Sequence, residues 1–87
     1  MKLKYNFIIN EVAGKMVAVA VGGDVENFNG FLKTNKEGAE ALEILKNDVS
    51  YDEIVTLMAE KHPETDLEEV KQFVTEFTEG LKNEGVL

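Results

Sequence analysis

The side chains able to do chemistry are few in this chain, and they are poorly grouped for catalysis. His62 is the only imidazole, and Glu60 and Glu64 flank it where Pro63 is expected to end a helix. A histidine needs partners at ligand or hydrogen-bond spacing before it can hold a metal or activate a nucleophile. Because a cation at the carboxyl end of a helix is stabilised by the helix dipole, we expect a structural role for His62.

Paired carboxylates are the second candidate for chemistry. Asp52 with Glu53, and Glu68 with Glu69, fall at predicted helix starts, where capping and the helix dipole account for them without a desolvated acid. The chain has no cysteine and no arginine, which excludes a thiol nucleophile, thiolate metal ligands and a guanidinium anion clamp. It also lacks a glycine-rich phosphate-binding motif. We therefore predict no catalytic residue, no metal site and no cofactor, and we expect that the protein is not an enzyme.

Composition and charge narrow the classes of partner. The 87 residues, 44% hydrophobic and 30% charged, predict one folded domain over 1–87. The net charge of −8 is uneven, because residues 1–36 hold five lysines and three acids, whereas residues 37–87 hold four lysines and fourteen acids. Such a surface repels phosphate backbones and anionic lipids, so neither nucleic acid nor a membrane is expected as a partner. No apolar run suits a signal peptide or a membrane span, which predicts a cytoplasmic protein.

The first part of the chain has the pattern of a small sheet. Strands are predicted over Phe7–Val12 and residues 16–21, with a tight glycine-containing turn between them. A third, shorter strand is predicted over residues 28–34. In that strand Leu32 and Thr34 share one face, while the opposite face carries Phe31 and Lys33.

The second part has helical spacing. A first helix is predicted over residues 36–46 with Asn35 as its N-cap, and a second begins after Ser50, which forms a capping box with Glu53. The predicted buried stripes are Gly38, Ala41, Leu42 and Leu45 in the first helix, and Ile54, Leu57 and Met58 in the second.

A third helix is predicted from Thr65 or Asp66, again with capping-box spacing to a glutamate, and Gly85 is its expected C-cap. The two residues after Gly85 are expected to fold back onto the core. The apolar stripe of this helix contains Val70, Phe73, Val74, Phe77 and Leu81. Gly80 inside the helix costs about 1 kcal/mol relative to alanine, and the close approach of another backbone is one explanation.

The predicted order, three antiparallel strands followed by three helices (β-β-β-α-α-α), indicates an α+β fold similar to a winged helix-turn-helix. In that fold the last helix of a DNA-binding protein enters the major groove. Here residues 66–84 contain six acids and two lysines, which opposes contact with phosphates. The fold alone therefore does not indicate DNA binding.

Several segments together resemble a known family. They are residues 28–39 (FNGFLKTNKEGA), 42–45 (LEIL), 50–55 (SYDEIV), 70–81 and 85–87 (GVL). In this order they are similar to the PqqD family of small peptide chaperones, which are recognition elements for precursor peptides of ribosomally synthesised natural products (RiPPs). The resemblance spans the chain from about residue 7 to its end.

The resemblance implies a non-catalytic role. Family members bind the leader segment of a precursor peptide and present it to a modifying enzyme, often a radical-SAM protein. The leader adds as an antiparallel strand beside the third strand and packs on the third helix, which is β-augmentation. The residues that this implies for peptide binding are Asn29, Phe31, Leu32, Lys33 and Thr34 on the strand, and Val70, Phe73, Val74 and Phe77 on the helix.

Other interpretations stay open at this point. Phe73 and Phe77 fit a plain core role, because a helix this apolar on one face must bury most of it. Phe31 and Lys33 are better candidates for lining a groove. A winged-helix transcriptional regulator, a protein-interaction module and a homodimer formed through the open strand edge all fit the same element order.

Overall fold

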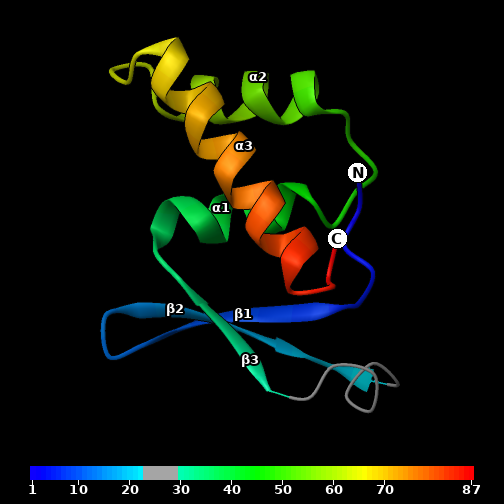
Figure 1. Ribbon diagram of the computed structural model, residues 1–87. Helices are drawn as coiled ribbons and strands as arrows, with labels where there is room; N and C mark the ends of the chain where they lie inside the picture. Colours follow the sequence, from blue (N-terminus) through cyan, green and yellow to red (C-terminus); the bar gives the residue numbers. More distant parts are fainter. Residues whose placement is uncertain (23–29) are drawn as a thin grey trace.

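The three strands form one antiparallel sheet that lies below the three helices in Figure 1. The computed structural model describes residues 1–22 and 30–87. The elements are β1 (Phe7–Val12), β2 (Lys15–Ala20), β3 (Phe31–Thr34), α1 (Lys36–Ile44), α2 (Tyr51–Lys61) and α3 (Leu67–Asn83). The predicted α+β class and the β-β-β-α-α-α order are therefore confirmed.

The strands β1 and β2 are joined by a two-residue turn. Val12 pairs with Lys15, and Ala13 and Gly14 between them have positive φ angles of 51° and 80°. Hairpin turns of this kind need positive φ at both central positions, which glycine adopts without steric penalty. The predicted turn is confirmed. Of the predicted third strand, residues 31–34 are confirmed, whereas residues 28 and 29 lie outside the described part of the chain.

The register of the sheet gives its two faces different roles. Ala18 in the central strand pairs with Ile9 and Leu32, and this row packs against the hydrophobic core. The next row lies on the opposite face and consists of Ile8, Val19 and Phe31, which are 51%, 41% and 54% exposed. Leu32 and Phe31 thus face opposite ways, as the strand pattern predicts.

The core lies between the inner face of the sheet and the helices. Its fully buried large side chains are Leu42, Leu45, Ile54, Val74 and Val86. The predicted stripe of α1 is confirmed. In α2 the prediction for Leu57 is wrong, because Leu57 is 39% exposed and Val55 is buried in its place. The helix contacts both α1 and α3, so the face that contains Ile54, Val55 and Met58 is the one that becomes covered.

The helix ends follow the predictions in part. Asn35 and Ser50 cap α1 and α2 as predicted. Asp66 is the N-cap of α3 but its side chain makes no capping hydrogen bond, so the predicted capping box there is wrong. The preceding turn is closed by backbone groups instead, with the Thr65 amide donating to the His62 carbonyl at 3.0 Å.

The carboxyl end of α3 turns back onto the core. Gly85 has a φ of 78°, and the Val86 amide donates to the Leu81 carbonyl at 3.1 Å, which is the arrangement of a glycine-terminated helix. Val86 is fully buried, and its carbonyl accepts a hydrogen bond from the Lys4 amide at 2.9 Å. The predicted fold-back of the last residues is confirmed.

Candidate functional site

The strand β3 lies at an edge of the sheet. Among the described residues it pairs with β2 alone, so its other edge presents backbone N–H and C=O groups without a strand partner. Lys33 lies on this strand with its Nζ 5.6 Å from the centre of the Phe31 ring, at the distance of a cation–π contact. Both side chains lie on the outer face, away from the helices. Asn29, the remaining predicted strand residue, lies outside the described residues.

The inner face of β3 meets α1 and α3 at one point. A Cβ atom placed on Gly38 would lie 2.9 Å from the Thr34 Cβ and 3.0 Å from the Phe77 Cε1. Only a residue without a side chain allows Thr34 and Phe77 to approach α1 so closely. We call these three residues, Thr34, Gly38 and Phe77, the junction. It places α3 beside the end of the edge strand.

The predicted apolar wall on α3 divides into two sets. Val70 and Val74 are 5% and 1% exposed and belong to the core. Phe73 and Phe77 are partly buried and lie between the core and the solvent. Their rings are stacked, with centroids 5.4 Å apart and an interplanar angle of 17°. The structure therefore brings Thr34 and Phe77 together. The aromatic pair is only partly buried and lies on the side of α3 that approaches the end of β3.

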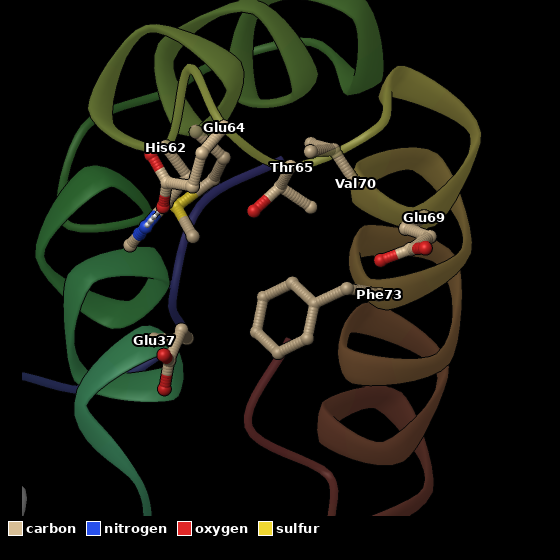
Figure 2. Close-up of a pocket in the computed structure, with 8 residues that line it drawn as sticks. Glu37, His62, Glu64, Thr65, Glu69, Val70 and Phe73 are labelled. Carbon is tan, nitrogen blue, oxygen red and sulfur yellow. Dashed lines mark ion pairs between the residues drawn. The ribbon is translucent and has the colours of Figure 1, made fainter.

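A pocket of about 290 Å³ opens next to this aromatic pair. Figure 2 shows the Phe73 ring pointing from α3 into the space between α1 and α3, with Glu37 across from it. The apolar part of the lining comes from Met58, Val70 and Phe73, and the polar part from Glu37, His62, Glu64, Thr65 and Glu69. The pocket thus joins an apolar floor to a rim of carboxylates.

The charge on the rim is negative. Within the described residues, neither Glu37 nor Glu69 takes part in an ion pair or a side-chain hydrogen bond. A cationic side chain above the apolar floor would meet unneutralised carboxylates on both sides, which favours a basic guest over an acidic one. The sequence indicates the acidic excess of this half of the chain, but not that Glu37 and Glu69 share a pocket.

His62 has a partner that sequence spacing does not reveal. Its Nε2 lies 2.7 Å from Glu40 Oε1, 22 residues away on α1, and its Nδ1 lies 3.8 Å from Glu64 Oε1. The hydrogen bond with Glu40 raises the pKa of His62 above its ordinary value of 6.5; burial opposes this, and the charges of Glu40, Glu64 and Glu37 add to it. The expected structural role of His62 thus gains a specific contact, which ties the end of α2 to α1.

Two other kinds of site are absent from the described residues. Over residues 1–22 and 30–87, no group of three or more histidine, aspartate or glutamate side chains is arranged to hold a metal ion. No helix in that part of the chain combines the length and the apolar composition that a bilayer crossing requires.

A known protein structure with a similar fold was found, although no similar sequence was. No protein-family model and no curated protein sequence match the chain. The fold is similar to that of a solved structure of TbiB1 in complex with the TbiA(beta) leader peptide, with a TM-score of 0.72 and 16% sequence identity. The likeness covers 100% of this chain and 94% of the other. At this identity it establishes the fold, and it agrees with the resemblance to peptide recognition elements.

Proposed function

We propose that this protein binds the leader segment of a ribosomally made precursor peptide and presents it, without catalysis, to a peptide-modifying enzyme. The observation that carries the proposal is the unpaired edge of β3, joined at Thr34 to the stacked pair Phe73 and Phe77 on α3. An extended peptide added to that edge gains main-chain hydrogen bonds, and the aromatic pair selects its side chains. The structurally similar TbiB1 holds a leader peptide, which supports the same role here.

The binding residues proposed on β3 are Phe31, Leu32, Lys33 and Thr34, through their backbone edge. Phe73 and Phe77 provide the wall, with Val70 at the floor of the pocket and Val74 buried behind it. The carboxylate rim favours a leader that carries lysine or arginine next to its apolar anchor. We propose a radical-SAM enzyme as the receiving partner, in keeping with the resemblance to PqqD, and a cytoplasmic setting.

The binding mode is tested by titrating ¹⁵N-labelled protein with synthetic leader peptides made from short reading frames encoded near this protein's gene. We expect amide shifts concentrated at residues 31–34 and on the Phe73 side of α3. Shifts confined to Phe7–Val12, which forms the other edge of the sheet, would move the site and overturn the proposal. Absence of binding at millimolar peptide would overturn the function itself.

Strand addition is tested separately with N-methylated peptides. Alternate amides of a strand point to opposite sides, so only one of the two alternating sets donates to β3. Methylating that set should weaken binding by about tenfold or more, because each lost hydrogen bond leaves a carbonyl unpaired. A leader methylated on the other set is the matched control and should bind nearly as well as the unmodified leader. Equal affinities would exclude strand addition.

The winged-helix regulator is the alternative, and charge opposes it. The helix α3 carries four glutamates and two lysines, so a phosphate backbone beside it would be repelled. Retardation of random duplex DNA at low salt would revive this alternative. Light scattering on the free protein tests the homodimer, in which a second copy would occupy the edge of β3.

A further inference from the structure

The outer face of the sheet is apolar although no described element covers it. Figure 1 shows the three helices on the other side of the sheet. The strand register places five apolar residues on this outer face, namely Ile8, Val12, Val17, Val19 and Phe31. Ile8, Val12 and Phe31 are each more than half exposed.

The central strand has the composition of a strand that is covered on both faces. A sheet with one solvated face alternates apolar and polar residues, whereas strands buried on both faces are nearly continuous apolar runs. Residues 16–20 (MVAVA) form such a run. Ala18 and Ala20 belong to the core, but Val19 between them is 41% exposed. Single exposed apolar residues are ordinary, whereas a patch formed by neighbours on three paired strands is typical of an interaction site.

The charge of the outer face differs from that of the molecule as a whole. The other residues that the strands place there are Asn10, Lys15 and Lys33, so both charged residues are cationic. Glu11, the one acid in the three strands, belongs to the alternate set that faces the helices. Neither lysine takes part in an ion pair within residues 1–22 and 30–87. We call the five apolar residues together with the two lysines the outer patch.

We propose that the outer patch docks the peptide-modifying enzyme, through an apolar surface of that enzyme bordered by carboxylates. The choice of partner rests on the proposed function. An apolar centre with charged groups at its rim is the usual composition of a protein interface, and carboxylates opposite Lys15 and Lys33 provide the complementary charge. A leader added to β3 lies in the plane of the sheet, so the outer patch stays accessible while the peptide is bound. One molecule then holds the peptide at its edge and the enzyme on its face.

A second copy of the chain is the other occupant to consider, and charge disfavours it. Two outer patches stacked face to face would bring together the lysines of both copies without a strand carboxylate to pair with them. Each copy also has a net charge of −8, so the two molecules repel each other at long range. An enzyme surface with carboxylates at the matching positions pairs the lysines instead.

The test uses substitutions on β1 and β2, because neither strand belongs to the proposed leader site. Ile8→Thr combined with Val19→Thr keeps β-branched side chains at exposed positions and should leave the urea midpoint and the leader affinity close to those of the wild type. The probes are the purified peptide-modifying enzymes encoded near this protein's gene, titrated calorimetrically with and without leader. We expect the wild type to bind one of them, and the double variant to bind it about tenfold more weakly or worse. Lys15→Glu should weaken the same binding about threefold or more, and less at high salt.

Matched controls lie on α2, away from the sheet. Leu57 is an exposed apolar residue and Lys61 an exposed lysine of that helix. Leu57→Gln and Lys61→Glu should leave the affinity for the enzyme within about twofold. An equal loss of affinity in these controls and in the outer-patch variants would show that the effect is not specific to the sheet, and the inference would fail.

The remaining outcomes separate the docking surface from the function on which it depends. Unchanged enzyme affinity in the double variant overturns the docking surface, and so does a wild-type protein that binds none of these enzymes. A dimer of the free protein, measured by sedimentation and dissociated by the double substitution, would assign the outer patch to self-association instead. If the enzyme binds through the outer patch but no leader binds at β3, the proposed peptide binding fails while the docking surface stands.

Discussion

Gly38 and Gly80 are both glycines inside helices, but their surroundings are opposite. A Cβ atom at Gly38 would overlap the Thr34 Oγ1 and lie 3.0 Å from the Phe77 Cε1, so the packing of β3, α1 and α3 requires a glycine there. A Cβ atom at Gly80 would meet no described atom within 4 Å. The first glycine is explained by the fold, whereas the second is not.

The difference divides α3 into two functional regions. At the junction, the Thr34 side chain and the Phe77 ring both lie close to the backbone of Gly38, so a small change there disturbs β3, α3 and α1. At Phe73 and Gly80, by contrast, the helix surface is only partly covered. Substitutions at the junction should therefore act mainly on stability, whereas Phe73, which lines the pocket, should affect stability less and binding more.

The largest effect is expected at the junction. Gly38→Ala forces its Cβ atom into the Thr34 side chain, and overpacking of this kind should lower the free energy of unfolding by about 2 kcal/mol. Urea denaturation measures the loss. Adding Thr34→Ala should recover part of it, because the shortest contact involves the Thr34 hydroxyl. A Gly38→Ala protein as stable as the wild type would show that the junction is not tightly packed.

Phe77 and Phe73 should likewise differ in how much they contribute to stability. Phe77→Ala removes the ring that contacts the junction and should cost about 2 kcal/mol of unfolding free energy, while Phe73→Ala, at the open pocket, should cost about 1 kcal/mol. Phe73→Ala should weaken the free energy of leader binding by at least as much as it lowers the free energy of unfolding. The comparison is made by urea denaturation and by titration on the same two variants. The reverse order of stabilities would contradict the division of α3.

A gain is expected at the other glycine. Gly80→Ala should stabilise the free protein by about 0.5–1 kcal/mol, since alanine restricts the unfolded chain and meets no obstacle in the helix. Urea denaturation of Gly80→Ala and Gly38→Ala should therefore show changes of opposite sign in the free energy of unfolding, although the chemical change is the same. Destabilisation by Gly80→Ala would mean that the position is packed after all.

The smallest effect is expected for the hydrogen bond between His62, at the end of α2, and Glu40 on α1. The Glu40 hydrogen bond raises the pKa of His62 above 6.5, so protonated His62 stabilises the folded state. This contribution is fully present below pH 6.5 and is lost as the pH rises through the higher native pKa. His62→Gln should therefore be less stable than the wild type at low pH and should approach it at high pH. Thermal unfolding between pH 5 and 9 measures the difference.

Two matched variants sharpen this pH test. Glu40→Gln replaces the carboxylate whose hydrogen bond and charge raise the pKa of His62, and it should flatten the pH dependence in the same way as His62→Gln. Glu64→Gln should change it less, because Glu64 Oε1 lies 3.8 Å from the imidazole and is more exposed. An unchanged pH dependence in Glu40→Gln would show that the contact contributes nothing to stability.

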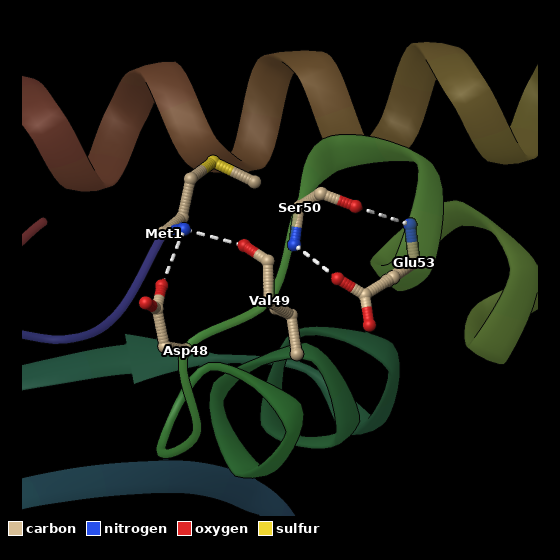
Figure 3. A network of polar contacts seen from close by, with 5 residues as sticks. All are labelled: Met1, Asp48, Val49, Ser50 and Glu53. Atoms are coloured by element: carbon tan, nitrogen blue, oxygen red, sulfur yellow. Dashed lines mark hydrogen bonds and ion pairs between the residues drawn. The ribbon is translucent and has the colours of Figure 1, made fainter.

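Much of the fold follows from short-range patterns. The box between Ser50 and Glu53, drawn in Figure 3, is confirmed by two hydrogen bonds, from the Ser50 amide at 2.9 Å and from the Glu53 amide at 3.1 Å. The backbone hydrogen bond from Ser50 also lowers the pKa of Glu53. The Asn35 cap and the glycine end of α3 are confirmed in the same way. Each depends on residues within about five positions of one another.

Contacts between distant segments were not predictable from these patterns. In Figure 3 the amino group of Met1 reaches the Asp48 carboxylate and the Val49 carbonyl, which no local motif indicates. Glu40 as the partner of His62 was missed for the same reason. The sequence shows an unfavourable helix residue at Gly80, for which a close backbone approach is one explanation, but it does not show the neighbours of Gly38, where the close contacts lie.

The elements, their order, the faces of the strands and most helix caps are predictable from the amino-acid sequence, because hydrogen bonding and periodicity act over a few neighbouring residues. Which helix and sheet faces are covered and which are open depends on the packing of distant segments, as the exposure of Leu57 and the junction at Gly38 demonstrate. Burial depends on the angles and distances at which helices pack against the sheet, and these arise from contacts among residues far apart in the chain.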